Sequence, residues 1–169
     1  MAEFHVEQRQ PLPVVTATVM VTLANIGERV GPVFDDLERS LHEAGLDDVL
    51  PGLLRYHAVE RDSEFRVDVA HVVPDGFVAP APYASEVLPG GLFAVATQSG
   101  PYEWITGLTR ELMEWGRQQG LDYAMLPSAD GEPPGAGETW ECWYEAYLEP
   151  PSYGEHGPEG PVQIALKLR

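Results

Sequence analysis

Four aromatic side chains and two carboxylates lie within eight residues near the end of the chain, in the segment WECWYEAY at residues 140–147. If this segment is a strand, side chains at every second position share one face, which then carries Glu141, Trp143, Glu145 and Tyr147. Aromatic rings attract a cation electrostatically, and a neighbouring carboxylate supplies the countercharge. The pattern therefore predicts a surface suited to a flat, lipophilic cation.

The overall charge points the same way. The chain has 27 acidic and 10 basic side chains, and its formal net charge is −17. This charge repels phosphate backbones and anionic membranes, so we expect neither nucleic acid nor a membrane as a direct partner. The field favours cationic ligands or basic protein surfaces, although an acidic surface also serves solubility alone.

Compartment can be predicted from cysteine usage and from the amino terminus. Cys142 is the only cysteine, which excludes an internal disulfide and a cysteine-rich zinc site. The amino terminus lacks a basic region followed by an apolar core, and no apolar run approaches about 18 residues. We therefore expect a cytoplasmic protein that is neither exported nor membrane-spanning.

In the first half of the chain, the hydrophobic period changes from that of a strand to that of a helix and back. Residues 14–22 are rich in β-branched side chains and predict a strand, whereas residues 25–45 carry apolar side chains at helical spacing. Residues 53–59 and 65–73 predict a hairpin with one buried face. Residues 74–91 contain four prolines and no sustained period, which indicates a long crossover with at most a short edge strand.

The second half repeats this order. Residues 92–98 predict a strand, residues 104–119 a helix, and residues 140–148 with 162–168 a second hairpin, with loops at 127–137 and 150–161. A shift of 75 residues superposes the apolar stripes of the two helices and the Gly-Leu pairs that end them, Gly45-Leu46 and Gly120-Leu121.

The predicted fold is therefore α+β, in one domain over residues 1–169. Its two β-α-β-β repeats, at about residues 1–75 and 88–169, are expected to associate through exposed faces or edges around a pseudo-twofold axis. Antiparallel sheets and the two main helices should flank a central groove, because pockets favour such internal interfaces.

Several motifs resemble the GyrI-like small-molecule-binding family, the effector-binding domain of AraC-type and multidrug-sensing regulators. LPGGLFAVAT at residues 88–97, SGPY at 99–102 and the Gly120-Leu121 helix end are similar to the family's "LPaG…A…GPY…l…GL" pattern. YEAY at 144–147 resembles its aromatic-Glu-x-Tyr strand, and residues 11–45 fit its first strand and helix. The resemblance thus covers nearly the whole chain.

The resemblance implies a central pocket for lipophilic, aromatic and frequently cationic compounds. The family's pocket carboxylate falls on Glu145, whereas a second acid common on the final strand falls on Gln163 here. No helix-turn-helix segment is visible in the chain, so we expect a stand-alone member that does not itself read DNA.

Tyr56 matches a frequent tyrosine of the family, Trp104 and Tyr102 lie at the first turn of the second helix, and Phe34 belongs to the first helix stripe, where core packing is the default. The ligand-contact candidates are Glu145, Trp143, Tyr147, Tyr56, Trp104, Tyr102 and Phe34.

Other chemistry finds little support. His57 and His71 fall on neighbouring strands, but two imidazoles without a third ligand make a poor metal site. Cys142 is expected on a buried face, together with Trp140, where a thiol is inert. The loop at 131–137 lacks the lysine of a phosphate-binding loop. No metal, cofactor or catalytic residue is predicted.

Three functions remain open. The leading hypothesis is a binding protein for hydrophobic, cationic aromatic molecules. The second, implied by the resemblance, is a hydrolase of reactive cyclopropane-containing aromatic metabolites, in which Glu145 would be catalytic. The third is an acidic protein that mimics DNA and inhibits a basic enzyme such as gyrase.

Overall fold

The computed structural model describes residues 2–46, 51–126 and 139–169. The predicted loop at 127–137 therefore lies outside the described residues. Within the described ranges the chain forms two α-helices and eleven strands, and a short 3-10 helix, η1, precedes the second α-helix. The elements in chain order are β1 (Glu3–Arg9), β2 (Leu12–Val21), α1 (Ile26–Glu43), β3 (Gly52–Tyr56), β4 (Phe65–Val72), β5 (Ala84–Leu88), β6 (Gly91–Pro101), η1 (Tyr102–Trp104), α2 (Ile105–Gln118), β7 (Met125–Leu126), β8 (Thr139–Trp140), β9 (Trp143–Tyr147), β10 (Ser152–Gly154) and β11 (Gly157–Lys167).

One antiparallel sheet joins the two predicted repeats. Its strand order is β1-β6-β11-β9-β3-β4-β2-β5, and β10 pairs with β11 at its side. Counted outward from the centre, one repeat contributes β3, β4 and β2, and the other contributes β9, β11 and β6 in matching order. The α+β fold with pseudo-twofold symmetry is thus confirmed, and the repeats meet edge to edge at the β3–β9 pair.

The outermost strands cross from one half of the sheet to the other. β1 belongs to the first half of the chain but pairs with β6 of the second repeat. β5 precedes the second repeat but pairs with β2 of the first. Each half of the sheet is therefore completed by a strand that comes from the other half of the chain.

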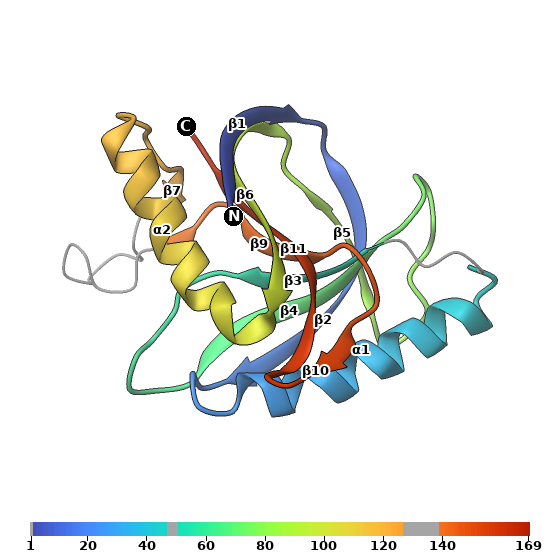
Figure 1. Ribbon diagram of the computed structural model, residues 1–169. Coiled ribbons are helices and arrows are strands. Elements are labelled where there is room, and N and C mark those ends of the chain that lie inside the picture. Colours follow the sequence, from blue (N-terminus) through green and yellow to red (C-terminus); the bar gives the residue numbers. More distant parts are fainter. Residues whose placement is uncertain (1, 47–50, 127–138) are drawn as a thin grey trace.

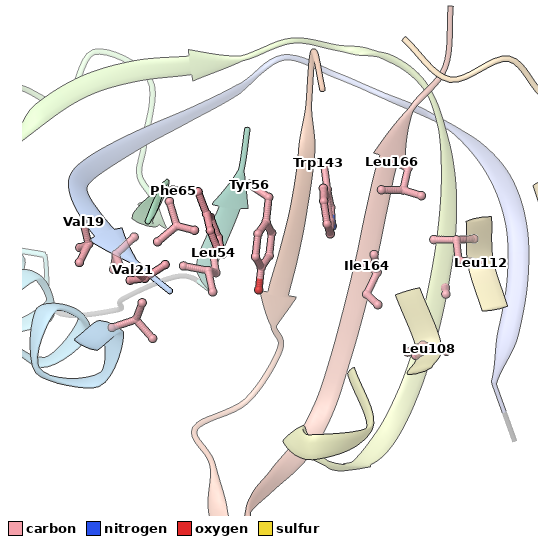
Figure 2. Close-up of a cluster of buried hydrophobic side chains, with 14 of the residues drawn as sticks. Val19, Val21, Leu54, Tyr56, Phe65, Leu108, Leu112, Trp143, Ile164 and Leu166 are labelled. Atoms are coloured by element: carbon pink, nitrogen blue, oxygen red, sulfur yellow. The ribbon is translucent and has the colours of Figure 1, made fainter. Parts of the chain in front are cut away.

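Each face of the sheet carries its own buried cluster. The larger cluster includes Leu37 and Leu41 of α1 and Leu108 and Leu112 of α2, so both helices pack on this face. Figure 2 shows this cluster spread across the strands, from Val19 near one end to Leu112 near the other. The opposite face holds a smaller cluster that includes Cys142, which is fully buried, in agreement with the buried face expected for it.

Strands that lie outside the predicted elements are held mainly by backbone pairing. β1 lies outside the predicted elements, although Phe4 and Val6 alternate with its polar residues, and Phe4 stacks on Trp115 of α2 with ring centroids 5.8 Å apart. β10 is a three-residue strand of exposed side chains inside a predicted loop. β5 is the short edge strand allowed for in the crossover.

The segment at 140–147 is not one continuous strand. The chain bends at residues 141–142, so Trp140 ends β8 and Trp143 begins β9. The placement of Trp140 on the face opposite Glu145 is therefore wrong, because its ring contacts Trp143 edge-on at 5.4 Å. The same bend directs Glu141 away from the predicted wall, and its carboxylate lies 3.4 Å from the Lys167 Nζ.

Candidate functional site

A cavity of about 720 Å³ lies where the two repeats meet. Its base is formed by β3 and β9 at the centre of the sheet, and α1 and the first turn of α2 form its sides. Residues 148–151 and the β10–β11 hairpin complete the lining. Figure 1 shows α1 and α2 running along the sheet with β3 and β9 at its centre. Both repeats thus line the cavity, which agrees with the central groove that the sequence predicts.

The pseudo-twofold axis passes next to one residue pair of the β3–β9 ladder. Leu54 pairs with Glu145, so the symmetry exchanges these two positions, and it exchanges Tyr56 with Tyr147, each two residues further along its strand. All four side chains line the cavity. The site therefore has a symmetric pair of tyrosines but a carboxylate on one side of the axis only.

Glu145 is buried, with 4% of its surface exposed. The Tyr147 hydroxyl donates a hydrogen bond of 2.8 Å to the Glu145 Oε2, and the Tyr56 hydroxyl donates a second bond to the same carboxylate. Burial raises the pKa of Glu145 to about 7, because desolvation penalises the charged form more than the two hydrogen bonds stabilise it. Near neutral pH this carboxyl group is divided between its two protonation states.

Aromatic rings surround the carboxyl group. Tyr56 stacks on Trp143 with centroids 4.4 Å apart and an interplanar angle of 22°, and the two rings lie side by side in Figure 2. On the other side of the acid, Tyr147 contacts Phe34 edge-on at 5.7 Å and Tyr102 at 5.3 Å. These contacts fix the rings that face the cavity.

The structure brings most of the predicted ligand contacts together. Five of the seven line the cavity, and Trp143 lies next to it in the stack with Tyr56. Trp104 does not line it; its indole packs over Gly100, and half of its surface is exposed. The five that line the cavity are Glu145, Tyr147, Tyr56, Tyr102 and Phe34.

Gln163 lies on the other face of the sheet. Its side chain bonds to Arg9 and to the Thr97 hydroxyl, 3.2 Å away. The absence of an acid at this position therefore does not change the charge of the cavity, because Gln163 is not among its lining residues.

Several lining residues were not predicted from the sequence. Gly27 and Gly31 come from α1, and His71 lies on β4, where its ring contacts Phe34 edge-on at 6.0 Å. Three further carboxylates line the cavity, and none of its described lining residues is a lysine or an arginine. The helical period could have predicted Gly27 and Gly31, because it places them on the same stripe as Val30 and Phe34. The three carboxylates are Asp35, Glu38 and Glu149.

The two histidines of the first hairpin do not form a metal site. His57 bonds to the buried Asp68, with 2.7 Å between Nε2 and Oδ2, whereas His71 faces the cavity. Within the described ranges, no group of three potential metal ligands is found. Burial also raises the pKa of the Cys142 thiol to about 11, which keeps it protonated at neutral pH.

This fold and site define a duplicated small-molecule-binding domain. The family model of the GyrI-like small molecule binding domain matches residues 2–130, and the chain belongs to this family. No curated protein matches the chain. No helix in the described part of the chain is long and apolar enough to cross a membrane.

Solved structures share the fold at low sequence identity. The EcmrR C-terminal domain is 14% identical with a TM-score of 0.70, and the match covers 100% of this chain and 98% of that domain. In the EcmrR–DNA complex the chain spans only 57% of the matched protein. SAV2435 bound to tetraphenylphosphonium is 13% identical with a TM-score of 0.57, covering 98% of this chain and 94% of that one. A hydrolase from Listeria innocua is 12% identical with a TM-score of 0.62, covering 98% and 92%.

Proposed function

We propose that the cavity binds lipophilic aromatic cations and that Glu145 provides the negative charge that attracts them. The observation that carries this proposal is a buried carboxyl group in the wall of a large cavity, whose hydrogen-bond partners among the described residues are two tyrosine hydroxyls. None of the ion pairs among the described residues involves Glu145, so a positively charged ligand would be its first cationic partner.

The energetics favour such a ligand. An unpaired buried carboxylate costs several kcal/mol, and this cost is what raises the pKa of Glu145. A bound cation removes much of this penalty, and each aromatic ring in contact adds roughly 0.5–2 kcal/mol depending on desolvation. One acid with Tyr56 and Tyr147 can therefore support binding in the micromolar range, about −8 kcal/mol.

The surroundings favour cations over anions as well. The other charged side chains of the lining are the carboxylates of Asp35, Glu38 and Glu149, and the whole chain has a net charge of −17. This field accelerates the approach of a cation and opposes that of an anion. The lipophilic cation bound to SAV2435, a protein with the same fold, supports the same class of ligand.

The test compares a cation with a neutral molecule of similar shape. Titration calorimetry should show that tetraphenylphosphonium binds more tightly than triphenylphosphine oxide. In Glu145→Gln we expect the affinity for tetraphenylphosphonium to fall by about tenfold or more, because the countercharge is lost. Glu141→Gln is the matched control, since Glu141 lies outside the cavity against Lys167. Equal affinities in wild type and Glu145→Gln would exclude the proposed role of this acid.

A hydrolase is the second candidate, and one observation favours it. A carboxyl group with a pKa of about 7 is suited to general acid–base catalysis at neutral pH. Product that accumulates beyond one equivalent per protein, and that disappears in Glu145→Gln, would support turnover.

We further propose a cytoplasmic location, where a single buried thiol needs no disulfide partner.

A further inference from the structure

Gly27 and Gly31 stand one helical turn apart on α1 and line the cavity. Neither has the positive φ angle that would require glycine. A Cβ atom built at either position meets no other atom within 4 Å. The backbone and the packing therefore give no reason for glycine at these two positions.

These glycines weaken the helix. Glycine inside a helix costs roughly 0.5–1 kcal/mol relative to alanine, and Pro32, next to Gly31, removes a backbone donor as well. Gly116 of α2 is different, because a Cβ there would clash with the Tyr123 hydroxyl at 1.9 Å. Gly107 of α2 also has open space around it, but it does not line the cavity.

The other repeat fills the equivalent positions. The shift of 75 residues that superposes the helices places Tyr102 and Thr106 where α1 has Gly27 and Gly31, and all four line the cavity. At these two pairs of positions the cavity is bounded by side chains of η1 and α2 but by bare backbone of α1, whose other lining residues, such as Val30 and Phe34, carry side chains. The Tyr102 hydroxyl is buried and has no hydrogen-bond partner among the described residues, so it is available to an acceptor on a bound molecule.

We propose that Gly27 and Gly31 form the wall against which the ring system of the ligand lies, and that the missing side chains set the largest ligand the cavity accepts. This inference deepens the proposed function, since it concerns the same cavity, but it depends on ligand size and not on ligand charge. Side chains at these positions should exclude multi-ring ligands and leave room for single-ring ones.

The experiment changes size at α1 and keeps Glu145 unchanged. In Gly27→Leu/Gly31→Leu we expect the affinity for tetraphenylphosphonium to fall by about tenfold or more, and that for benzyltrimethylammonium to change by less than about threefold. Leucine adds volume without adding an aromatic ring that could itself attract a cation. Gly107→Leu, the matched control in α2, should leave both affinities unchanged.

A second variant separates loss of space from damage to the helix. Gly27→Ala/Gly31→Ala should raise the melting temperature, because alanine favours the helix, and should keep most of the affinity. The leucine variant should melt no lower than wild type, since its side chains point into open space. Equal affinity of the leucine variant and wild type for tetraphenylphosphonium, or an equal loss for both cations, would overturn the proposal.

A neutral multi-ring probe distinguishes this inference from the proposed function. N-phenyl-1-naphthylamine carries no charge, so its binding should not depend on Glu145 and should be kept in Glu145→Gln. Its binding should be lost in the leucine variant, where side chains fill the space, and kept in Gly107→Leu. If charged and neutral probes bind wild type equally, the preference for cations fails, while a selective loss in the leucine variant still supports the wall. If no multi-ring probe binds wild type, the wall is excluded.

Discussion

At the scale of single residues, the site is one acid held by two tyrosines that come from different repeats. Tyr56 and Tyr147 occupy symmetry-related positions, and both hydroxyls donate to Glu145. Two hydrogen bonds hold the carboxyl group in place without supplying a positive charge. The protein thus keeps a destabilising group in its interior, a common cost of a binding site.

Glu145→Gln should therefore stabilise the empty protein at alkaline pH. A pKa of about 7 in the folded state, above the usual 4.5, means that the folded protein holds this proton more tightly than the unfolded chain. The contribution of Glu145 to stability is then greatest below pH 4.5 and is lost as the pH rises through 7. Urea unfolding at pH 8 should show a gain on the order of 3 kcal/mol for the variant, shrinking towards pH 5.

The control for this measurement is Glu141→Gln, whose carboxylate is partly exposed and pairs with Lys167 outside the cavity. Its effect on the free energy of unfolding should be small and should not vary between pH 5 and pH 8. If Glu145→Gln were no more stable at pH 8 than at pH 5, relative to wild type, the carboxyl group would not have a raised pKa.

At the scale of elements, the hydrophobic period predicts the helices and strands that pack in the core. It does not predict the strands that are held mainly by backbone pairing. Both helices and the central strands have apolar stripes, so their positions could be predicted. β10 could not, because its three exposed side chains give no period, and β1 has only a short alternation in which Phe4 and Val6 are the apolar members. Within the site, the alternation of β9 placed Glu145 and Tyr147 on one face, but nothing in the pattern indicated the bend that removes Glu141 from that face.

A second buried carboxylate, Asp68 of β4, shows the opposite behaviour to Glu145. Its side chain is fully buried and accepts hydrogen bonds from Thr18 at 2.9 Å, His57 at 2.7 Å and Arg66 at 3.0 Å. Burial alone raises the pKa of Asp68, but these three donors outweigh it and lower the value to about 2. This carboxylate joins β2, β4 and the residue after β3 on the face away from the cavity.

Asp68→Asn should lower the free energy of unfolding at pH 7 by about 2 kcal/mol, because the ionised group that three donors stabilise is lost. A lowered pKa contributes stability that is complete above pH 4 and is lost as the pH falls towards 2. The difference from wild type should therefore narrow below pH 4 in urea titrations. Asp122→Asn, at an exposed site 3.8 Å from Arg169, serves as the control and should change stability little at any pH. A constant difference from pH 7 to pH 3 would contradict this account.

At the scale of the whole molecule, the crossing of β1 and β5 ties the two halves of the chain together. Seven residue pairs join β1 to β6, and five join β5 to β2, in addition to the central β3–β9 pairing. Neither half of the chain can complete its own part of the sheet. The cavity, which both repeats line, therefore exists only when both are folded.

Separate fragments covering residues 1–76 and 77–169 should each lack a cooperative unfolding transition and should recover one when mixed. Each fragment alone leaves a sheet edge unpaired and exposes one side of the β3–β9 junction. Circular dichroism during thermal unfolding, at about 0.15 M salt to screen the negative charges, measures this directly. A cooperative transition in either fragment alone would show that the exchanged strands are dispensable.

The position of Glu145 beside the axis also limits how such a site could arise. In a homodimer of a single repeat, the residue at this position would face its own copy across the axis. Two glutamates there would stand about 5 Å apart at their Cβ atoms and would share one proton, whereas two leucines would give no charge at all. A single carboxylate opposite a leucine requires two copies that can mutate separately. Fusion of the repeats into one polypeptide supplies two such copies and so allows a single carboxyl group beside the axis of the cavity.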